Sequence, residues 1–190
     1  MTNITTIIFD FYGVVRGDGL LAWLTEIGLA DDKEIQHIDD ERCAGRLTRE
    51  EYLTHLSRLT KYDSDFILER ISQAPKLNSP VVNIIAKLHE RYQTALLSNS
   101  TQSTLPYIEQ HGIDKLFDRM FLSHELGMIK PQPEIYQYAL SRLGVKPEAT
   151  VFIDDKAANT AAARGLGMYA IDFKSPSQLT SELAKLGVKC

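Results

Sequence analysis

Near the N-terminus, residues 4–15 read Ile-Thr-Thr-Ile-Ile-Phe-Asp-Phe-Tyr-Gly-Val-Val. The first six of these residues are β-branched or aromatic, which is typical of a strand buried in a sheet. Asp10 ends this apolar run, and Gly13 breaks the strand pattern shortly afterwards. The stretch therefore predicts a buried strand over residues 4–10 that carries a carboxylate at its carboxyl end.

The next part of the chain, residues 17–74, has a helical pattern and no strand signal. Thr48 and Glu51 have the spacing of a capping box, and the residues that follow at helical spacing are Tyr52, Leu53, Leu56 and Leu59. Ser79 and Pro80 then have the types expected at the N-cap and first position of a new helix. We therefore expect a wholly helical segment inserted after the first strand.

From residue 79 onward, short apolar strands alternate with amphipathic helices. The predicted strands cover residues 94–97, 119–122, 150–153 and 168–171, and the predicted helices include residues 100–112, 133–143 and 156–166. Alternation of this kind is typical of a parallel sheet with helices on both faces. The predicted fold is therefore α/β, a Rossmann-like parallel sheet flanked by helices, with a small all-helical segment inserted after the first strand.

Composition and charge narrow the range of functions. The 190 residues are 44% hydrophobic and 24% charged, which is ordinary for a globular protein, and the formal net charge is −4. Nucleic acids and anionic membrane surfaces normally bind to a basic face, so the net charge makes us expect neither as a partner. No uncharged apolar run is long enough to span a bilayer, so we expect no transmembrane helix. Cys43 and Cys190 give no disulfide framework, which favours free thiols in the cytoplasm. No feature of the sequence predicts an oligomeric state.

Polar side chains follow three of the predicted strands. Asp10 ends the first strand, Ser98 and Asn99 follow the second, and Asp154 and Asp155 follow a later one. Ligands of open parallel sheets bind beyond the carboxyl ends of the strands, so these groups are expected to converge there, together with Lys130 from a loop. Such a set suits the binding of a phosphate ester, provided that a cation offsets the repulsion between the carboxylates and the phosphate.

Four segments resemble, in order, the motifs of the haloacid dehalogenase-like hydrolases. They read Phe-Asp-Phe-Tyr-Gly-Val-Val at 9–15, Leu-Ser-Asn at 97–99, Lys-Pro at 130–131, and Val-Phe-Ile-Asp-Asp-Lys-Ala-Ala-Asn at 151–159. The last motif is similar to the Asp-Asp-x-x-x-Asn branch, which includes sugar-phosphate phosphatases and the phosphatase half of soluble epoxide hydrolases. The resemblance implies a hydrolase core of residues 1–16 and 80–190 and a helical cap of residues 17–79.

The resemblance also implies catalytic roles. Asp10 would be the nucleophile and would form an aspartyl-phosphate. Ser98 and the backbone near Asn99 would hold phosphate oxygens, and Lys130 would pair with the phosphate and with Asp10. The implied substrate is a small phosphorylated metabolite.

A magnesium ion is the implied cofactor. Its ligands would be Asp10, the backbone carbonyl of Tyr12, and Asp155, because aligning Asn159 with the final position of the family motif places Asp155 at the usual metal position. Asp154 would then be an outer-sphere or alternative ligand, and Asn159 is expected to brace the loop through its amide. An all-oxygen set of this kind suits Mg²⁺.

Tyr12 departs from the pattern of the phosphatases that the chain resembles, since these usually carry an aspartate two residues after the nucleophile. Side chains two positions apart in an extended segment face the same way, so we expect Tyr12 to face the site as a catalytic group. A phenol with an ordinary pKa of about 10 is a poor base at neutral pH. The substitution therefore predicts a phosphatase that is slow or limited to good leaving groups, such as acyl or anomeric phosphates.

Two alternative functions stay open at this point. Asp-x-Tyr-Gly is also the first motif of 2-haloacid dehalogenases, in which the aspartate attacks carbon without a metal. The adjacent acids Asp154 and Asp155 argue against that chemistry, because without a cation they would raise a carboxylate pKa and blunt the nucleophile. The second alternative is a catalytically weak protein that binds a phosphorylated ligand without turning it over.

Overall fold

The computed structural model describes residues 3–73 and 77–189. Within them, a five-stranded parallel sheet has the order β3-β2-β1-β4-β5. The strands are β1 (Thr6–Phe9), β2 (Gln93–Ser98), β3 (Arg119–Leu122), β4 (Thr150–Asp154) and β5 (Tyr169–Asp172). The predicted α/β fold with a Rossmann-like parallel sheet is therefore confirmed, although β1 is shorter at both ends than the predicted span of 4–10.

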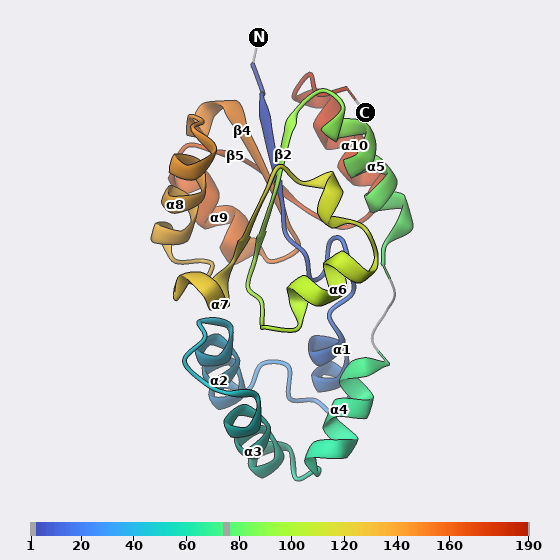
Figure 1. The fold of residues 1–190 in the computed structure, drawn as a ribbon, viewed down its shortest axis with the longest axis vertical. Helices are drawn as coiled ribbons and strands as arrows, with labels where there is room; N and C mark the ends of the chain where they lie inside the picture. Colours follow the sequence, from blue (N-terminus) through green and yellow to red (C-terminus); the bar gives the residue numbers. More distant parts are fainter. Residues whose placement is uncertain (1–2, 74–76, 190) are drawn as a thin grey trace.

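Alternation along β1 divides the core into two layers. Ile7 and Phe9 pack on the side covered by α5 (Ser79–His89), α6 (Thr104–Gln110) and α10 (Pro176–Lys185). Ile8 packs on the opposite side, which α8 (Pro133–Leu143) and α9 (Ala157–Gly165) cover. Figure 1 shows these two helical layers on either side of the sheet. All four residues of β1 are buried, as expected for a central strand flanked by helices on both faces.

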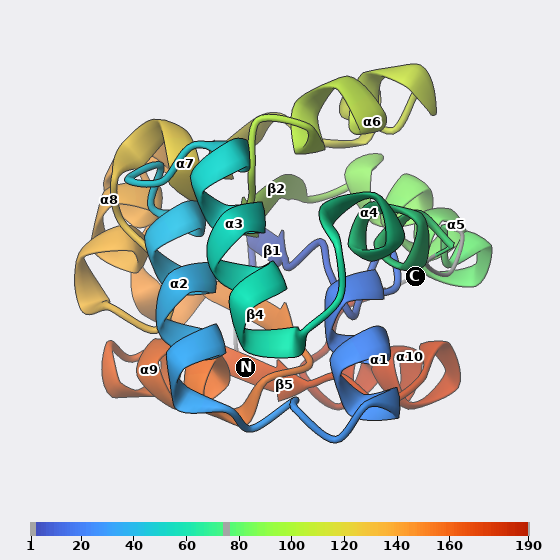
Figure 2. The ribbon, with the colours of Figure 1, turned by 90° about the horizontal axis from the view of Figure 1, so that it is seen from below.

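The segment between β1 and α5 is helical, as predicted. It contains α1 (Gly19–Glu26), α2 (Lys33–Cys43), α3 (Arg49–Thr60) and α4 (Ser64–Ser72), and residues 17–73 contain no strand. We refer to residues 19–72 as the helical insert. The helices pack around an apolar cluster of their own that includes Trp23, Tyr52 and Leu56. Figures 1 and 2 show the insert lying beyond the carboxyl ends of the strands.

Local signals at the helix ends are partly confirmed. The capping box at the start of α3 is present: the Thr48 hydroxyl accepts from the Glu51 amide, and the Glu51 carboxylate accepts from the Thr48 amide. The prediction for α5 was wrong by one position, because Asn78 is the N-cap and Ser79 is already helical. Residues 74–76, which include the predicted end of the helical pattern at Ala74, lie outside the described residues, as do residues 1–2 and 190.

The residues that flank the insert on its two sides pair with each other. Arg16, which follows β1, forms an antiparallel bridge with Leu77, and the Asn78 amide donates to the Val15 carbonyl at 2.8 Å. This pairing holds Leu77 and Asn78, which precede α5, next to the residues that follow β1. No helix within residues 3–73 and 77–189 combines the length and hydropathy that a bilayer-spanning helix needs.

Candidate active site

Three carboxylates meet at the carboxyl ends of β1 and β4. Asp10 follows β1, Asp154 ends β4, and Asp155 follows it; each offers an oxygen that lies within 4.8 Å of the others. The meeting follows from topology, because β1 and β4 are parallel neighbours with Phe9 opposite Ile153. The predicted convergence of these acids is therefore present in the structure.

Lys130 joins the carboxylates from the loop before α8. Its Nζ lies 2.7 Å from Asp10 Oδ1 and 2.6 Å from Asp154 Oδ2, and the residue is only 2% exposed. Burial, reinforced by the charge of Asp154, raises the pKa of Asp10 well above its ordinary value despite the opposing effect of Lys130. Burial alone would lower the pKa of Lys130, but the charges of Asp10 and Asp154 outweigh it and raise that pKa. Lys130 is thus held protonated between two acids.

The Asp154 carboxylate is occupied on both oxygens by the protein itself. Besides the Lys130 ammonium on Oδ2, Oδ1 accepts from the Lys156 amide at 2.8 Å, and the Asn159 amide lies 3.0 Å from both oxygens. Asn159 thus braces the loop after β4, in keeping with its predicted structural role. With these partners and no exposed surface, Asp154 orients Lys130 and leaves little of its own carboxylate for a ligand.

Asp155 differs from Asp154 in how its oxygens are paired. Its Oδ1 is buried without a hydrogen-bond partner among the described residues. Burial first, and the charge of Asp154 second, raise the pKa of the Asp155 carboxyl. Unpaired buried carboxylate oxygens are costly, and a hard divalent cation is the partner that such a set of oxygens accommodates best. The donor set of Asp10 and Asp155 therefore fits Mg²⁺.

Gly13 allows this carboxylate to lie close to the backbone. Its φ is +86°, and a Cβ added there would lie 2.2 Å from Asp155 Oδ2. Glycine at this position therefore serves both the turn and the close approach of Asp155. This contact could not be predicted from the sequence, because it depends on residues that are far apart in the chain.

Ser98 and Asn99 lie where β2 ends. The Ser98 hydroxyl is buried and donates to the Asn99 carbonyl at 3.2 Å. The Asn99 side chain spans to the Lys130 backbone, donating to its carbonyl at 2.9 Å and accepting from its amide at 2.8 Å. Asn99 thus ties the loop after β2 to the loop that carries Lys130, which is a bracing role that the sequence analysis did not assign to it.

Tyr12 lies just beyond Asp10 and is partly buried. Its hydroxyl is hydrogen-bonded to Thr104 Oγ1 at 3.1 Å, at the start of α6, and its ring meets Phe11 edge-on with centroids 5.0 Å apart. Burial raises the pKa of Tyr12, so the phenol stays protonated at neutral pH. The Tyr12 hydroxyl therefore bonds to the first residue of α6. The predicted alternation of side chains along the strand did not indicate this partner.

The insert brings further charges toward these residues. Burial would lower the pKa of Lys156, but Asp18 and Asp39 of the insert side and Asp10 and Asp155 of the sheet side together raise it. The charge of Lys156 is therefore stabilised by acids from distant parts of the chain. This arrangement could not be predicted from the sequence, because no local pattern shows which insert residues face the sheet.

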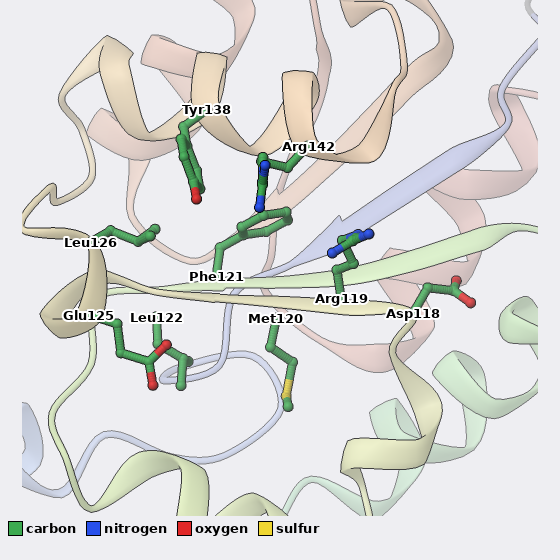
Figure 3. A pocket seen from close by; sticks show the side chains of 9 residues that line it. All are labelled: Asp118, Arg119, Met120, Phe121, Leu122, Glu125, Leu126, Tyr138 and Arg142. Carbon is green, nitrogen blue, oxygen red and sulfur yellow. The ribbon is translucent and has the colours of Figure 1, made fainter.

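A separate hollow of 280 Å³ runs along the edge strand β3. Figure 3 shows Arg119 and Phe121 of β3 and Tyr138 and Arg142 of α8 around it. None of the predicted site residues lines this hollow. The chemistry-bearing residues are thus gathered at the carboxyl ends of the strands, away from the β3 edge.

Comparison with known proteins identifies the family of this chain. Residues 4–167 match the family model described as haloacid dehalogenase-like hydrolase. The chain is 28% identical to D-ribitol-5-phosphate phosphatase of Bacteroides thetaiotaomicron, over 95% of this chain and 97% of that protein.

Solved structures share the fold. A HAD family enzyme of B. thetaiotaomicron, crystallised with magnesium and inorganic phosphate, superposes with a TM-score of 0.71 at 22% identity, over 90% of this chain and 94% of that one. A dehalogenase superposes with the same TM-score of 0.71 at 20% identity, over 97% and 99% of the two chains. Since the family model spans most of the sequence and the fold agrees, this chain belongs to the haloacid dehalogenase-like hydrolases.

Proposed function

We propose that the protein is a Mg²⁺-dependent phosphatase of small phosphate monoesters that acts through an aspartyl-phosphate on Asp10. The observation that carries the proposal is the buried cluster of Asp10, Lys130 and Asp154 beside the unpaired oxygen of Asp155. A nucleophilic carboxylate, a fixed ammonium and an unpaired carboxylate oxygen are the groups that phosphoryl transfer needs. The relative that acts on D-ribitol-5-phosphate supports a small phosphorylated metabolite as substrate.

The geometry indicates how Asp10 would react. Oδ1 is engaged by Lys130 Nζ at 2.7 Å and by the Phe11 amide at 2.7 Å, which leaves Oδ2 for attack. Attack on phosphorus breaks the bond between phosphorus and the leaving oxygen, which takes up a proton from solvent water. Water then attacks the phosphorus of the aspartyl-phosphate, which releases inorganic phosphate and restores the Asp10 carboxylate. Lys130 and Ser98 would hold the phosphate oxygens through both displacements.

The residues that would hold Mg²⁺ are Asp10, the backbone carbonyl of Tyr12, and Asp155, with Asp154 as an outer-sphere or alternative ligand. When bound there, Mg²⁺ supplies positive charge between the carboxylates and the incoming phosphate. Asp155 is the better direct ligand, because Asp154 is already bonded by Lys130, Lys156 and Asn159 whereas Asp155 Oδ1 has no partner among the described residues.

We assign residues 17–79 as a cap over this site and residues 1–16 and 80–190 as the catalytic core. The position of α1–α4 beyond the strand ends supports this division (Figure 2). We place the chain in the Asp-Asp-x-x-x-Asn branch on residues 154–159, and we propose that it acts in the cytoplasm.

Release of inorganic phosphate from aryl, acyl, anomeric and alkyl phosphates, with Mg²⁺ and with a chelator, tests the proposal. We expect phosphate release that requires Mg²⁺ and is fastest for the acyl and anomeric phosphates. Halide release from a 2-haloacid without metal would instead establish the dehalogenase alternative. Binding of phosphate esters without any product would establish the weak-binding alternative.

Replacing Tyr12 by aspartate is expected to speed the hydrolysis of alkyl phosphates. Tyr12 occupies the position of an acid–base aspartate, and such a group typically contributes about 10²–10⁴-fold in rate. We expect part of that range, because the shorter side chain would also lose the hydrogen bond to Thr104. Tyr12→Asn is the matched control, since asparagine has the shape of aspartate without the acid. Equal rates in the two variants would show that Tyr12 does not lie at the acid–base position.

Replacing Gly13 by alanine is expected to weaken Mg²⁺ binding by at least about tenfold. The new Cβ would lie 2.2 Å from Asp155 Oδ2, and a positive φ strains any residue but glycine. Isothermal titration of the protein with Mg²⁺ measures the change. Gly28→Ala, at a glycine of similar φ with open space around it, controls for backbone strain alone. Equal Mg²⁺ affinities in both variants and the wild type would show that Asp155 is not a Mg²⁺ ligand.

A further inference from the structure

We propose that Ser123 is a positioning residue that couples the seating of the helical insert to the alignment of Lys130. The inference rests on the proposed function in one respect, namely that Lys130 acts on the substrate. Ser123 itself touches neither Lys130 nor the carboxylates in any described contact. It begins α7 (Ser123–Leu126), the short helix that follows β3.

The Ser123 hydroxyl joins the end of α2 to the loop that follows β2. It donates to the Cys43 carbonyl at the end of α2, and it accepts from the Ser100 amide at 2.8 Å. A hydroxyl has one proton to donate, and the Cys43 carbonyl is its nearer acceptor, since the Ser100 carbonyl lies at 3.4 Å. Ser123 and Ser100 have no exposed surface and Cys43 is only 8% exposed, so little room is left for water as a substitute partner. Loss of this hydroxyl therefore leaves a buried amide and a buried carbonyl unpaired.

The same end of α2 makes two further contacts with the sheet side. Cys43 and Ala44 form a small apolar cluster with Ile129, the residue directly before Lys130. Gly45 lies so close to α7 that an added Cβ would be 2.6 Å from the His124 carbonyl oxygen. Figure 1 shows the end of α2 directly beneath α7, and the two helices are in contact. The insert is thus docked against α7 and the loop before α8.

From this contact, a short series of bonds leads to the nucleophile. Ser100 follows Asn99, whose side chain holds both the amide and the carbonyl of Lys130. Lys130 in turn lies 2.7 Å from Asp10 Oδ1. Ser123 therefore supports Lys130 through Asn99, and Ile129 supports it directly. When the insert is displaced, both supports weaken together, and a shift of about 1 Å in a catalytic group can cost about 10²-fold in rate.

Ser123→Ala and Gly45→Ala test the coupling. The first changes α7 on the sheet side of the contact, and the second changes the insert. Each is expected to lower kcat by about tenfold to a hundredfold on the best ester of the phosphate panel. Thr150→Val is the matched control: it removes a buried hydroxyl bonded to the Lys146 carbonyl at the other end of β4, and we expect it to retain kcat. The decisive variant combines Ser123→Ala with Gly45→Ala. One shared docking contact predicts a loss no larger than that of the worse single variant, whereas independent effects would multiply and would contradict the proposal.

Hydrogen exchange tests the coupling without any substrate. This test is therefore valid even if the protein is not a phosphatase. In Gly45→Ala, whose substituted residue lies in the insert, we expect faster amide exchange in residues 98–101 and 129–130 than in the wild type. Exchange that accelerates only within residues 43–47 would overturn the proposal, because the insert would then move without affecting Lys130. If no phosphate of the panel is hydrolysed but amide exchange changes as expected, the phosphatase function would be rejected and the coupling between the insert and Lys130 would be supported.

Discussion

Asp10→Asn is expected to abolish phosphate release while leaving the protein folded. The variant keeps the size of the side chain but removes the attacking oxygen, and loss of a nucleophile costs on the order of 10⁶-fold in enzymes where it has been measured. Asp10 is 4% exposed and lies beside the buried Asp154, so removing its charge relieves repulsion in the site. The melting temperature is therefore expected to be equal to or higher than that of the wild type. Phosphate release and thermal unfolding measure the two effects.

Asp31→Asn, at an exposed position of the insert, is the control for this variant and is expected to retain full activity. Asp10→Asn that releases phosphate at the wild-type rate would contradict the nucleophilic role. A large loss of stability in Asp10→Asn would contradict net repulsion between Asp10 and Asp154, since it would mean that the Asp10 carboxylate stabilises the fold.

Lys130→Ala is expected to be the most destabilising single change in the site. Lys130 Nζ is the shared partner of Asp10 and Asp154, both of which are buried, and removing it leaves two carboxylates facing each other. Breaking a buried ion pair on one side typically costs about 3–5 kcal/mol of unfolding free energy. Urea denaturation followed by circular dichroism measures the loss, and phosphate release is expected to fall by at least about 10²-fold.

The double variant Lys130→Met with Asp154→Asn separates charge from packing. It removes the ammonium together with one of the two carboxylates, so we expect it to recover much of the stability that Lys130→Ala loses. Lys115→Ala, at an exposed position, is expected to change the unfolding free energy by less than about 0.5 kcal/mol. A loss in Lys130→Ala no greater than in Lys115→Ala would contradict a charged, buried Lys130.

The sheet and the meeting of its polar ends could be predicted because both follow from local patterns. Apolar runs separated by amphipathic helices specify parallel strands, and parallel strands place their carboxyl ends together. Asp10 and Asp154 were therefore predictable as neighbours, although the sequence places them far apart. The capping box at Thr48 was equally local and is present in the structure.

The supports of the site could not be predicted in the same way. Gly13 beside Asp155, Asn99 on the Lys130 backbone, and Ser123 between Cys43 and Ser100 all join segments without a shared periodicity. Such contacts depend on the exact path of loops, to which a hydrophobic pattern is insensitive. Tyr12 illustrates the same limit, since alternation predicts its face but not its bond to Thr104.

Rapid acid quench of the protein during turnover of acetyl phosphate with Mg²⁺, followed by mass spectrometry, is the direct test of an aspartyl-phosphate on Asp10. We expect the peptide containing Asp10 to gain the mass of one phosphoryl group, and we expect this adduct to be absent from Asp10→Asn and from samples quenched in chelator. Phosphate release without an adduct on the Asp10 peptide, or an adduct on any other residue, would contradict the nucleophilic role of Asp10.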